Sequence, residues 1–353
     1  MDLVQAYDSD DYNEEEQFDK ARKRKAYSVD WKLDVVNYAK QISIHSASEK
    51  FKVDRKNVRE WDIDIDVVAV LNDTTGTMMA CAFNENTCNM GVICGTGSNA
   101  CYMERIDRIK KLNGVVDPEK DGLPNEMCVN TEWGGFGDDG VLEFVRTKHD
   151  RILDENTINA RKQLMEKMIS GMYMGELVRI VLEDLAKEKL IFNGDYEAIS
   201  QRGCFPTKFV SEIESEMQEA EENAFPKTQA ILEDIGITVV TPIDCVNVAY
   251  VCSVVSTRAA HLCACGIGAL LKRMEKPYVT VGVDGSVYRF HPTFHDLLDQ
   301  KIDDLIDGKY EFQLMLSEDG SGRGAALVAA VATRMAKEIA SRKPSVLNLS
   351  AQS

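Results

Sequence analysis

The sequence lacks the cysteine spacing that marks a disulfide framework or a zinc site. Ten cysteines are scattered over 353 residues, no Cys-x-x-Cys occurs, and Cys263-x-Cys265 has no His or Cys partner at ligand spacing. The first residues also lack the pattern of a secretory signal peptide. We therefore expect buried, reduced thiols in a cytoplasmic protein, and no resident metal.

No uninterrupted apolar run is long enough to cross a bilayer. The longest apolar region, residues 246–271, contains Arg258 and His261 near its middle. Charged side chains inside a membrane span are costly, so we expect a buried helix of a soluble protein and no membrane partner.

Basic charge is scarce except in one segment. The net charge is −17, which excludes a nucleic-acid binder that uses its whole surface. Residues 1–19 carry eight acidic and no basic side chains, whereas residues 20–60 carry twelve basic and five acidic ones. We predict disordered tails at 1–19 and 341–353, with a separate basic segment at 20–61.

The basic segment, residues 20–61, has the pattern of three short helices. Ser28 is a suitable N-cap, Trp31 starts an apolar face, and Val58 and Trp61 lie at helical spacing. The segment resembles the DNA-binding region of Brinker-like and transposon-derived helix-turn-helix proteins. That resemblance implies that a third helix would contact DNA through Arg55, Lys56, Asn57 and Arg59.

The acidic residues 62–66 follow this segment directly and would repel phosphates. A basic helical hairpin with a solvated face is therefore the alternative interpretation. If the segment does bind DNA, we expect the protein in the nucleus as well as in the cytoplasm.

From about residue 63 onward the pattern is that of an α/β fold. Residues 67–71 form an apolar, β-branched run that predicts a buried strand, which Asn72 and Asp73 end. Open α/β sheets bind ligands at the carboxyl ends of their strands, where an Asp can take a proton from a substrate hydroxyl. A turn that caps the next helix explains the same residues, since Asp and Thr are good N-caps.

Two glycine-containing stretches follow. We expect two strands around a polar turn at residues 84–87, the second of which ends in Gly95-Thr96-Gly97. Backbone next to glycine can approach an anion closely, which favours a phosphate loop, although a hairpin turn is the alternative. Residues 130–138 form a glycine-rich loop with Glu132, which suits a small polar ligand or, alternatively, holds an aromatic plug.

The following part of the chain is mainly helical in pattern. Residues 163–190 predict an amphipathic helical region that is interrupted near Gly171 and Gly175. Residues 247–274 predict a buried helix that carries Ser256, Thr257 and Arg258.

The last part returns to strands and a glycine-rich loop. Residues 278–283 predict a strand, and residues 284–286 would turn it into a hairpin partner at 287–290. Residues 317–324 form a Gly/Ser loop before an Ala-rich helix at about 325–339. A loop of this kind at a helix N-terminus is a natural phosphate or nucleotide site.

Taken in order, these stretches resemble the C-terminal portion of eukaryotic hexokinases from about residue 66 to 339. The resemblance implies an α/β fold of the actin-like ATPase (ribonuclease H-like) type over residues 62–340, preceded by the small all-α helix-turn-helix. It also implies transfer of the γ-phosphoryl group of ATP, with Mg²⁺, to the 6-hydroxyl of glucose or another hexose. The matching runs are LNDTTGTMM, GVICGTGSNACYMER, VNTEWGGFGD, YMGELVR, TKFVSEIES, STRAAH, VGVDGSVYRFHPTF and GSGRGAALVAAV.

The resemblance also assigns roles to individual residues. Asp73 would be the general base, and the residues that hold sugar hydroxyls would be Asn72, Asn99, Glu132 and Glu214. The residues that border phosphate or nucleotide would be Gly95, Thr96, Gly97, Ser256, Thr257, Arg258, Gly320 and Ser321.

The sequence departs from a complete hexokinase unit before the Asn-Asp pair. Such a unit carries an earlier phosphate loop and a small lobe that closes over the sugar, whereas about sixty unrelated residues stand here. Three hypotheses follow: a phosphotransferase, a fusion or pseudoenzyme that binds sugar and nucleotide without catalysis, and a DNA-binding regulator.

Overall fold

A computed structural model describes residues 68–219, 225–317 and 319–342. The chain divides into two units, residues 1–67 and Val68–Ser353, and only the second contains described residues. The predicted helix-turn-helix at 20–61 and both predicted tails lie essentially outside this part of the chain.

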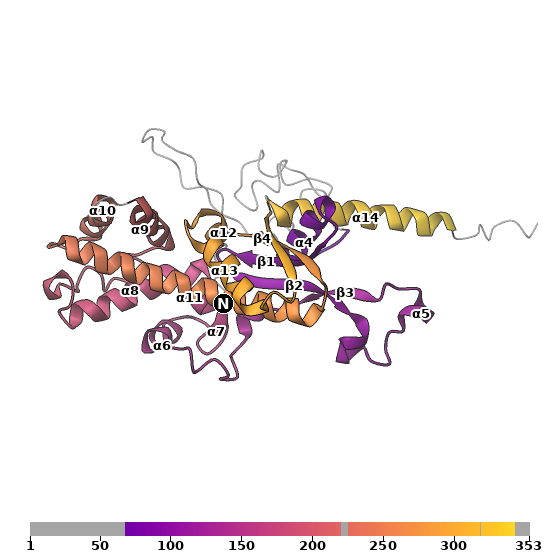
Figure 1. Ribbon diagram of the computed structural model, residues 1–353, viewed down its shortest axis with the longest axis horizontal. Helices are drawn as coiled ribbons and strands as arrows, with labels where there is room; N and C mark the ends of the chain where they lie inside the picture. The colour runs from indigo at the N-terminus through magenta and orange to yellow at the C-terminus, as the bar shows by residue number, and fades with distance from the viewer. Residues whose placement is uncertain (1–67, 220–224, 318, 343–353) are drawn as a thin grey trace, which may run out of the picture. The chain divides into compact units, whose positions relative to one another are not determined.

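The second unit is built on a five-stranded mixed sheet in the order β3-β2-β1-β4-β5 (Figure 1). Its antiparallel half pairs β1 with β2 and β2 with β3, while its parallel half pairs β1 with β4 and β4 with β5. The strands are Cys88–Cys94 (β1), Ser98–Arg105 (β2), Glu126–Asn130 (β3), Tyr278–Asp284 (β4) and Glu311–Leu316 (β5).

Helices α4 and α14 lie together on one side of the sheet (Figure 1). They are Asp73–Asn84 and Gly320–Arg342. They approach closely because neither has a side chain at the crossing: a Cβ added at Gly324 would overlap the carbonyl oxygen of Gly76. A small sulfur-rich core, which includes Met78, Cys81, Cys88 and Cys101, fills the space between α4 and the sheet.

The main hydrophobic core lies around the long helix α11, Pro242–Met274, which contacts the sheet through β2. Thr241 and Asp244 form a capping box at its start, and Pro242 takes the first turn, where its missing N–H costs nothing. This 33-residue helix is long and apolar enough to cross a membrane by length and composition alone. Half of its most apolar window is buried inside the protein, as in the core helix of a soluble domain.

Shorter helices surround α11 and complete the unit. The α-helices are Pro118–Asp121 (α5), Lys148–Glu155 (α6), Leu164–Ile169 (α7), Gly171–Lys187 (α8), Thr207–Glu219 (α9), Pro226–Ile235 (α10), Ser286–Phe290 (α12) and Phe294–Ile306 (α13). The 3-10 helices are Ile106–Arg108 (η1), Lys110–Leu112 (η2), Trp133–Gly135 (η3) and Phe192–Gly194 (η4).

Several predicted elements are confirmed. The structure has the buried helix at 247–274 as part of α11 and the strand at 278–283 as β4. The helical region is interrupted at Gly171, where α8 begins, but Gly175 lies inside α8 without a break.

Two predicted strands near the N-terminal end of the unit are wrong. Residues 68–71 form no strand with any described part of the chain, and Val70 is 90% exposed. An apolar run becomes a strand only where another strand offers hydrogen bonds. The second wrong prediction is the strand just before the polar turn at 84–87. These residues belong to α4, which continues to Asn84.

The predicted hairpin at 287–290 is also wrong. Gly285 has a positive φ of 116° and turns the chain from β4 directly into α12. The chain then crosses over through α13 and enters the sheet as β5, parallel to β4. The predicted Ala-rich helix exists but starts earlier, at Gly320, because its glycines pack against α4.

Candidate active site

The candidate active site starts at the N-terminus of α4. Asn72 caps this helix: its Oδ1 accepts hydrogen bonds from the amide of Thr74 at 3.0 Å and from the Thr74 hydroxyl at 2.6 Å. Asp73 is the first helical residue and is exposed, and its Oδ1 accepts from the Thr74 amide at 2.8 Å. A helix does start here, as the cap interpretation expected, but the N-cap is Asn72 rather than Asp73 or a threonine, and the Asp73 carboxylate stays open to a ligand.

Three carboxamides converge on one carboxylate next to this helix. Glu132 Oε1 accepts hydrogen bonds from Asn130 Nδ2 at 2.6 Å, from Asn99 Nδ2 at 3.2 Å and from Asn72 Nδ2 at 3.5 Å. Asn99 also donates to Asn130 Oδ1 at 2.8 Å. We call Asn72, Asn99, Asn130 and Glu132 the carboxamide cluster.

The carboxamide cluster depends on two strand ends. Asn99 lies on β2 and Asn130 ends β3, whereas Glu132 follows in the left-handed region with φ of 49°. A residue other than glycine in this conformation is held by its surroundings and is frequent at binding sites. Carboxylate and carboxamide groups together offer acceptors and donors, which is the chemistry that recognises a ligand rich in hydroxyls.

Glu166 on α7 is a further carboxylate at this site that the sequence interpretation missed. Its Oε2 accepts from the amide of Ser98 at 3.1 Å, and its side chain lies against Gly97 and Gly134. Burial, and next the negative charge of Glu132, raise the pKa of Glu166 above 4.5, while the Ser98 amide and Lys167 oppose this shift. In sequence, a single Glu in a helical pattern looks like part of a solvated face, so no local signal could have identified it.

Gly95, Thr96 and Gly97 form the hairpin turn between β1 and β2, the alternative that the sequence left open. The carbonyls of Gly95 and Thr96 accept hydrogen bonds from the first amides of α8, at 2.8 and 3.1 Å. A Cβ added at Gly95 would lie 3.2 Å from the Cα of Gly285. Glycine is therefore needed here at least for the close packing of two loops.

The N-terminus of α14, which begins at Gly320, lies next to the turn at Gly285. Gly320 donates its amide to Asp284 Oδ2 at 3.0 Å, and Asp284 Oδ1 accepts from the Gly285 amide at 2.7 Å. A Cβ added at Gly76 would lie 2.9 Å from the Ser321 carbonyl oxygen. The structure thus connects Gly95 to Gly285 and Gly320 to Asp284. Asp284 is the third site residue, after Asn130 and Glu166, that the sequence interpretation did not select.

Ser256, Thr257 and Arg258 lie on α11 and have other partners. Arg258 forms a bidentate ion pair with Asp150 on α6, at 2.7 and 2.8 Å, and Ser256 donates to the carbonyl of its own helix at Ser253. Thr257 and Arg258 line an open cavity of about 360 Å³ together with His261. The predicted nucleotide role of these three residues stays a prediction.

Glu214 is buried on α9 and contacts the start of α13. Its Oε2 accepts from the Thr293 hydroxyl at 3.3 Å, and its Oε1 lies 3.3 Å from Nε2 of His291. None of these contacts involves the carboxamide cluster, so the predicted sugar contact of Glu214 stays a prediction. The predicted DNA-binding residues Arg55, Lys56, Asn57 and Arg59 lie outside the described residues.

The described ranges hold no group of three His, Cys, Asp or Glu side chains that could bind a metal ion.

The chain shares its sequence and fold with known proteins. The family profile described as hexokinase matches residues 89–331. The chain is 45% identical to human hexokinase-1 over 290 residues and 44% identical to human hexokinase-2 over 298 residues. These matches cover 80% and 82% of this chain but only 30% and 31% of the relatives.

Solved structures agree with this result. A hexokinase from Schistosoma mansoni complexed with glucose has a TM-score of 0.70 and 38% identity, covering 78% of this chain and 60% of that chain. Another hexokinase crystal structure has a TM-score of 0.62 and 28% identity, and the match covers 74% of this chain and 55% of that chain.

The family profile covers more than half of the chain, and we conclude that this chain belongs to the hexokinase family. Its five-stranded unit is accordingly an actin-like hexokinase lobe. The chain spans about 30% of the length of the curated relatives that it matches.

Proposed function

We propose that this chain is an ATP-dependent hexose phosphotransferase lobe that binds glucose and carries the base for its 6-hydroxyl. The carboxamide cluster beside Asp73 is the observation that carries this proposal. The solved relative from Schistosoma mansoni contains glucose, which supports glucose as the hexose.

The geometry of the site supports a role for each of these residues. Asn72, Asn99 and Glu132, with Asn130 and Glu166, would exchange their mutual hydrogen bonds for bonds to sugar hydroxyls. Asp73 would accept the proton of the attacking hydroxyl, a contribution of roughly 10²–10⁴ to the rate. The glycine turns at Gly95 and Gly320 would border the phosphates of MgATP, whose Mg²⁺ would neutralise developing charge.

The test is a coupled assay of glucose 6-phosphate formation by the full chain. Asp73→Ala should reduce the rate by about 10²–10⁴ or to background. Asp234→Ala, which removes an exposed aspartate on α10, is the matched control and should leave the rate unchanged. Equal rates for wild type and Asp73→Ala would rule out this base.

A second candidate function follows from the length of the match. The chain covers only 60% of the Schistosoma hexokinase chain, so binding of sugar and nucleotide without turnover is the alternative. Isothermal titration with glucose and with MgATP, beside the coupled assay, separates a binding lobe from an enzyme.

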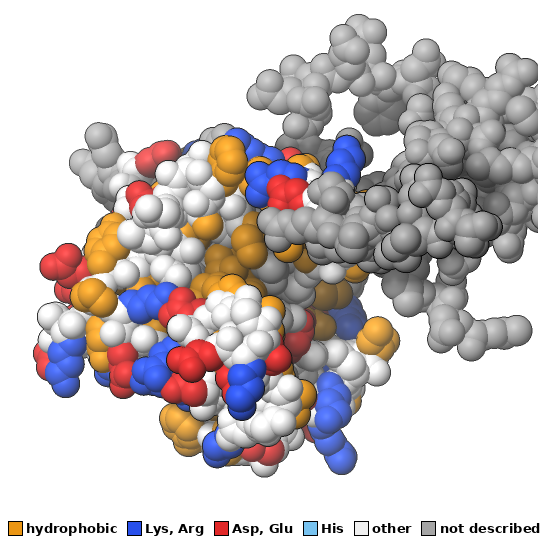
Figure 2. All heavy atoms as spheres, turned by 90° about the vertical axis from the view of Figure 1, so that its right-hand side faces the viewer, with side chains coloured by type: hydrophobic (Ala, Val, Ile, Leu, Met, Phe, Trp, Pro, Cys, Tyr) orange, Lys and Arg blue, Asp and Glu red, His pale blue; other side chains and the backbone are white. Residues whose placement is uncertain are grey.

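DNA binding through Arg55, Lys56, Asn57 and Arg59 stays a separate prediction, as does the cytoplasmic location. Figure 2 shows Lys and Arg side chains interspersed with Asp and Glu on one face of the described lobe. A mixed surface of this kind does not attract a polyanion. A mobility-shift assay with residues 20–61 deleted from the full chain would test whether any DNA binding depends on that segment.

A further inference from the structure

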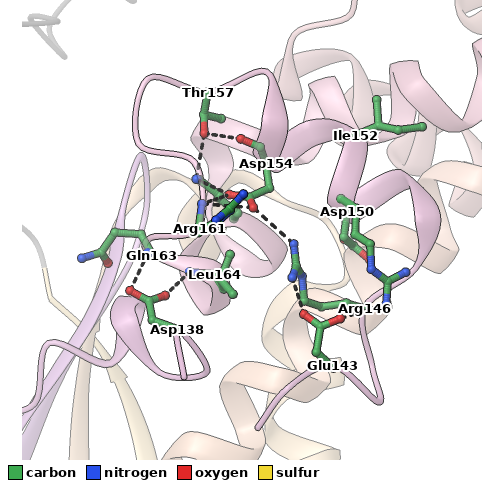
Figure 3. Close-up of polar contacts among 12 residues, drawn as sticks. Asp138, Glu143, Arg146, Asp150, Ile152, Asp154, Thr157, Arg161, Gln163 and Leu164 are labelled. Carbon is green, nitrogen blue, oxygen red and sulfur yellow. Dashed lines mark hydrogen bonds and ion pairs between the residues drawn. The ribbon is translucent and has the colours of Figure 1, made fainter. Parts of the chain in front are cut away.

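Helix α7, which carries Glu166, is only six residues long and depends on side chains from outside the helix. Gln163, the residue before it, has a positive φ of 58° and provides no cap of its own. Asp138 supplies the missing acceptor, since its Oδ2 and Oδ1 accept from the amides of Gln163 and Leu164 at 3.2 and 3.0 Å (Figure 3). A helix this short is not stable in isolation, so such contacts decide where it lies.

Lys167 anchors the same helix from inside the protein. Its side chain is 3% exposed, and Nζ donates to Asp154 Oδ1 at 2.7 Å, to Thr157 Oγ1 at 2.8 Å and to the Asn159 carbonyl at 2.9 Å. All three N–H groups of the ammonium are therefore used, as a buried charge requires.

Asp154 is fixed as firmly as its partner. Its carboxylate accepts the Arg161 amide at 2.9 and 3.1 Å and lies 3.4 Å from a guanidinium nitrogen of Arg146 (Figure 3). Its backbone carbonyl accepts the Thr157 hydroxyl at 2.7 Å. The pair thus joins α7 to α6 and to the loop between them.

Adjacent residues of an α-helix point about 100° apart, so an anchor on one sets the direction of the other. Lys167 points into the 154–159 loop, while Glu166 reaches the Ser98 amide in the candidate sugar site. We propose that the buried Lys167–Asp154 pair is a positioning device that holds Glu166 toward the hexose. This inference rests on the proposed function for the identity of the ligand.

The charges around Glu166 support this role. Burial and then Glu132 raise the pKa of Glu166, whereas the Ser98 amide and Lys167 lower it. Burial and then the charge of Glu166 raise the pKa of Tyr173 on α8. Removing the ammonium takes away one of the two interactions that lower the pKa of Glu166 and leaves only the Ser98 amide to oppose burial and Glu132. Glu166 then becomes protonated at a higher pH and loses part of its capacity to accept hydrogen bonds from hydroxyls.

The first experiment needs no sugar. The full chain is labelled with ¹³C-carboxyl glutamate, the Glu166 signal is assigned by its loss in Glu166→Gln, and its titration is followed by NMR. Lys167→Met should move this titration to higher pH, whereas the control Lys162→Met, an exposed lysine on the same loop, should not. Identical titrations in wild type and Lys167→Met would overturn the positioning role.

A second variant covers the case in which Lys167→Met does not fold. The double substitution Asp154→Leu with Lys167→Met replaces both charges by apolar groups of similar volume, which buried pairs often tolerate. The double variant should fold, and its Glu166 carboxyl should still titrate at a higher pH than in the wild type. If Glu166 titrates in the double variant as it does in the wild type, this result would also count against the proposal.

The third measurement is the dissociation constant of glucose. Lys167→Met and the double variant should bind glucose roughly tenfold more weakly, and KM should change more than kcat. Lys167→Arg keeps the positive charge and should restore part of the affinity. Unchanged affinity in both variants would refute the positioning role. Failure of the wild-type chain to bind glucose would instead refute the proposed function, and the titration would still decide the role of Lys167.

Discussion

Asn99 Nδ2 lies 2.8 Å from Asn130 Oδ1, although the residues are 31 positions apart in the chain. Their strands pair so that Cys101 faces Asn130, which places Asn99 one diagonal step away at the same end of the sheet. The two carboxamides therefore form one platform that orients Glu132.

Removal of one member of this platform should weaken hexose binding. Asn130→Ala deletes the 2.6 Å hydrogen bond to Glu132, and a hydrogen bond to a charged group contributes about 1.5–3 kcal/mol. We expect glucose to bind roughly tenfold or more weakly, as measured by isothermal titration. Asn113→Ala changes an exposed loop residue and serves as the control; an equal effect of both substitutions would contradict the prediction.

The raised pKa of Glu166 predicts a specific dependence of stability on pH. A carboxyl with a folded-state pKa above its unfolded value favours the folded state at low pH, and this contribution is lost as pH rises through the folded pKa. Glu166→Gln removes the penalty of the buried charge. The melting temperature of Glu166→Gln relative to wild type should therefore rise as the pH increases above 4.5. A difference that stays constant from pH 4 to 8 would show that Glu166 does not titrate in this range.

The contribution of Asp150 to stability should change with pH in the opposite direction. Burial alone would raise its pKa, but the hydrogen bonds and charge of Arg258, with Thr147, outweigh this and lower the pKa below 3.8. A group with a depressed pKa stabilises the fold above its unfolded pKa and loses this effect as the pH falls through the folded pKa. Asp150→Asn should cost about 3 kcal/mol at pH 7, and much less near pH 3, in urea unfolding.

The ion pair between Arg258 and Asp150 allows a test of the predicted nucleotide role of Arg258. Arg258→Met should lower the free energy of unfolding because it leaves Asp150 unpaired. If the guanidinium only holds α11 to α6, MgATP should bind the folded variant as it binds wild type. A selective loss of MgATP affinity in a folded variant would support the nucleotide role.

The close contact between the sheet and α4 predicts a sensitive glycine. A Cβ added at Gly91 would overlap the Thr74 carbonyl oxygen and press on Met78, so Gly91→Ala should cost about 1–3 kcal/mol and disturb Asp73. Gly322→Ala is the control, since its added Cβ meets only the flexible side chain of Asp319. Differential scanning calorimetry would measure both; equal stability of the two variants would contradict the packing argument.

Long, regular patterns allowed correct predictions from the sequence. The apolar period over 247–274 and the β-branched run over 278–283 predict α11 and β4, and β4 also has partner strands on both sides, β1 and β5. Residues 68–71 have an equally good strand pattern but lack a described partner strand. The hairpin partner predicted at residues 287–290 is wrong because the turn at Gly285 leads into helix α12. The chain needs this helix and α13 to cross over to β5, which lies parallel to β4.

The site could be predicted only where a motif marks it. Asn72, Asp73, Asn99 and Glu132 lie in recognisable runs, and three of them meet in the carboxamide cluster. Glu166 has no such mark, because its position depends on α7 lying against the β1–β2 turn. Glu214 also lies in a recognisable run, but its described contacts are with His291 and Thr293 and not with the carboxamide cluster.

The contact between Gly95 and Gly285 has a consequence for ligand affinity. These turns come from distant parts of the chain and touch each other, and the Asp284–Gly320 hydrogen bond fixes the N-terminus of α14 beside them. The entropy of bringing these three segments together is therefore lost when the chain folds. If they border MgATP, as we propose, they retain more of their contact energy as affinity than segments that must assemble around a ligand.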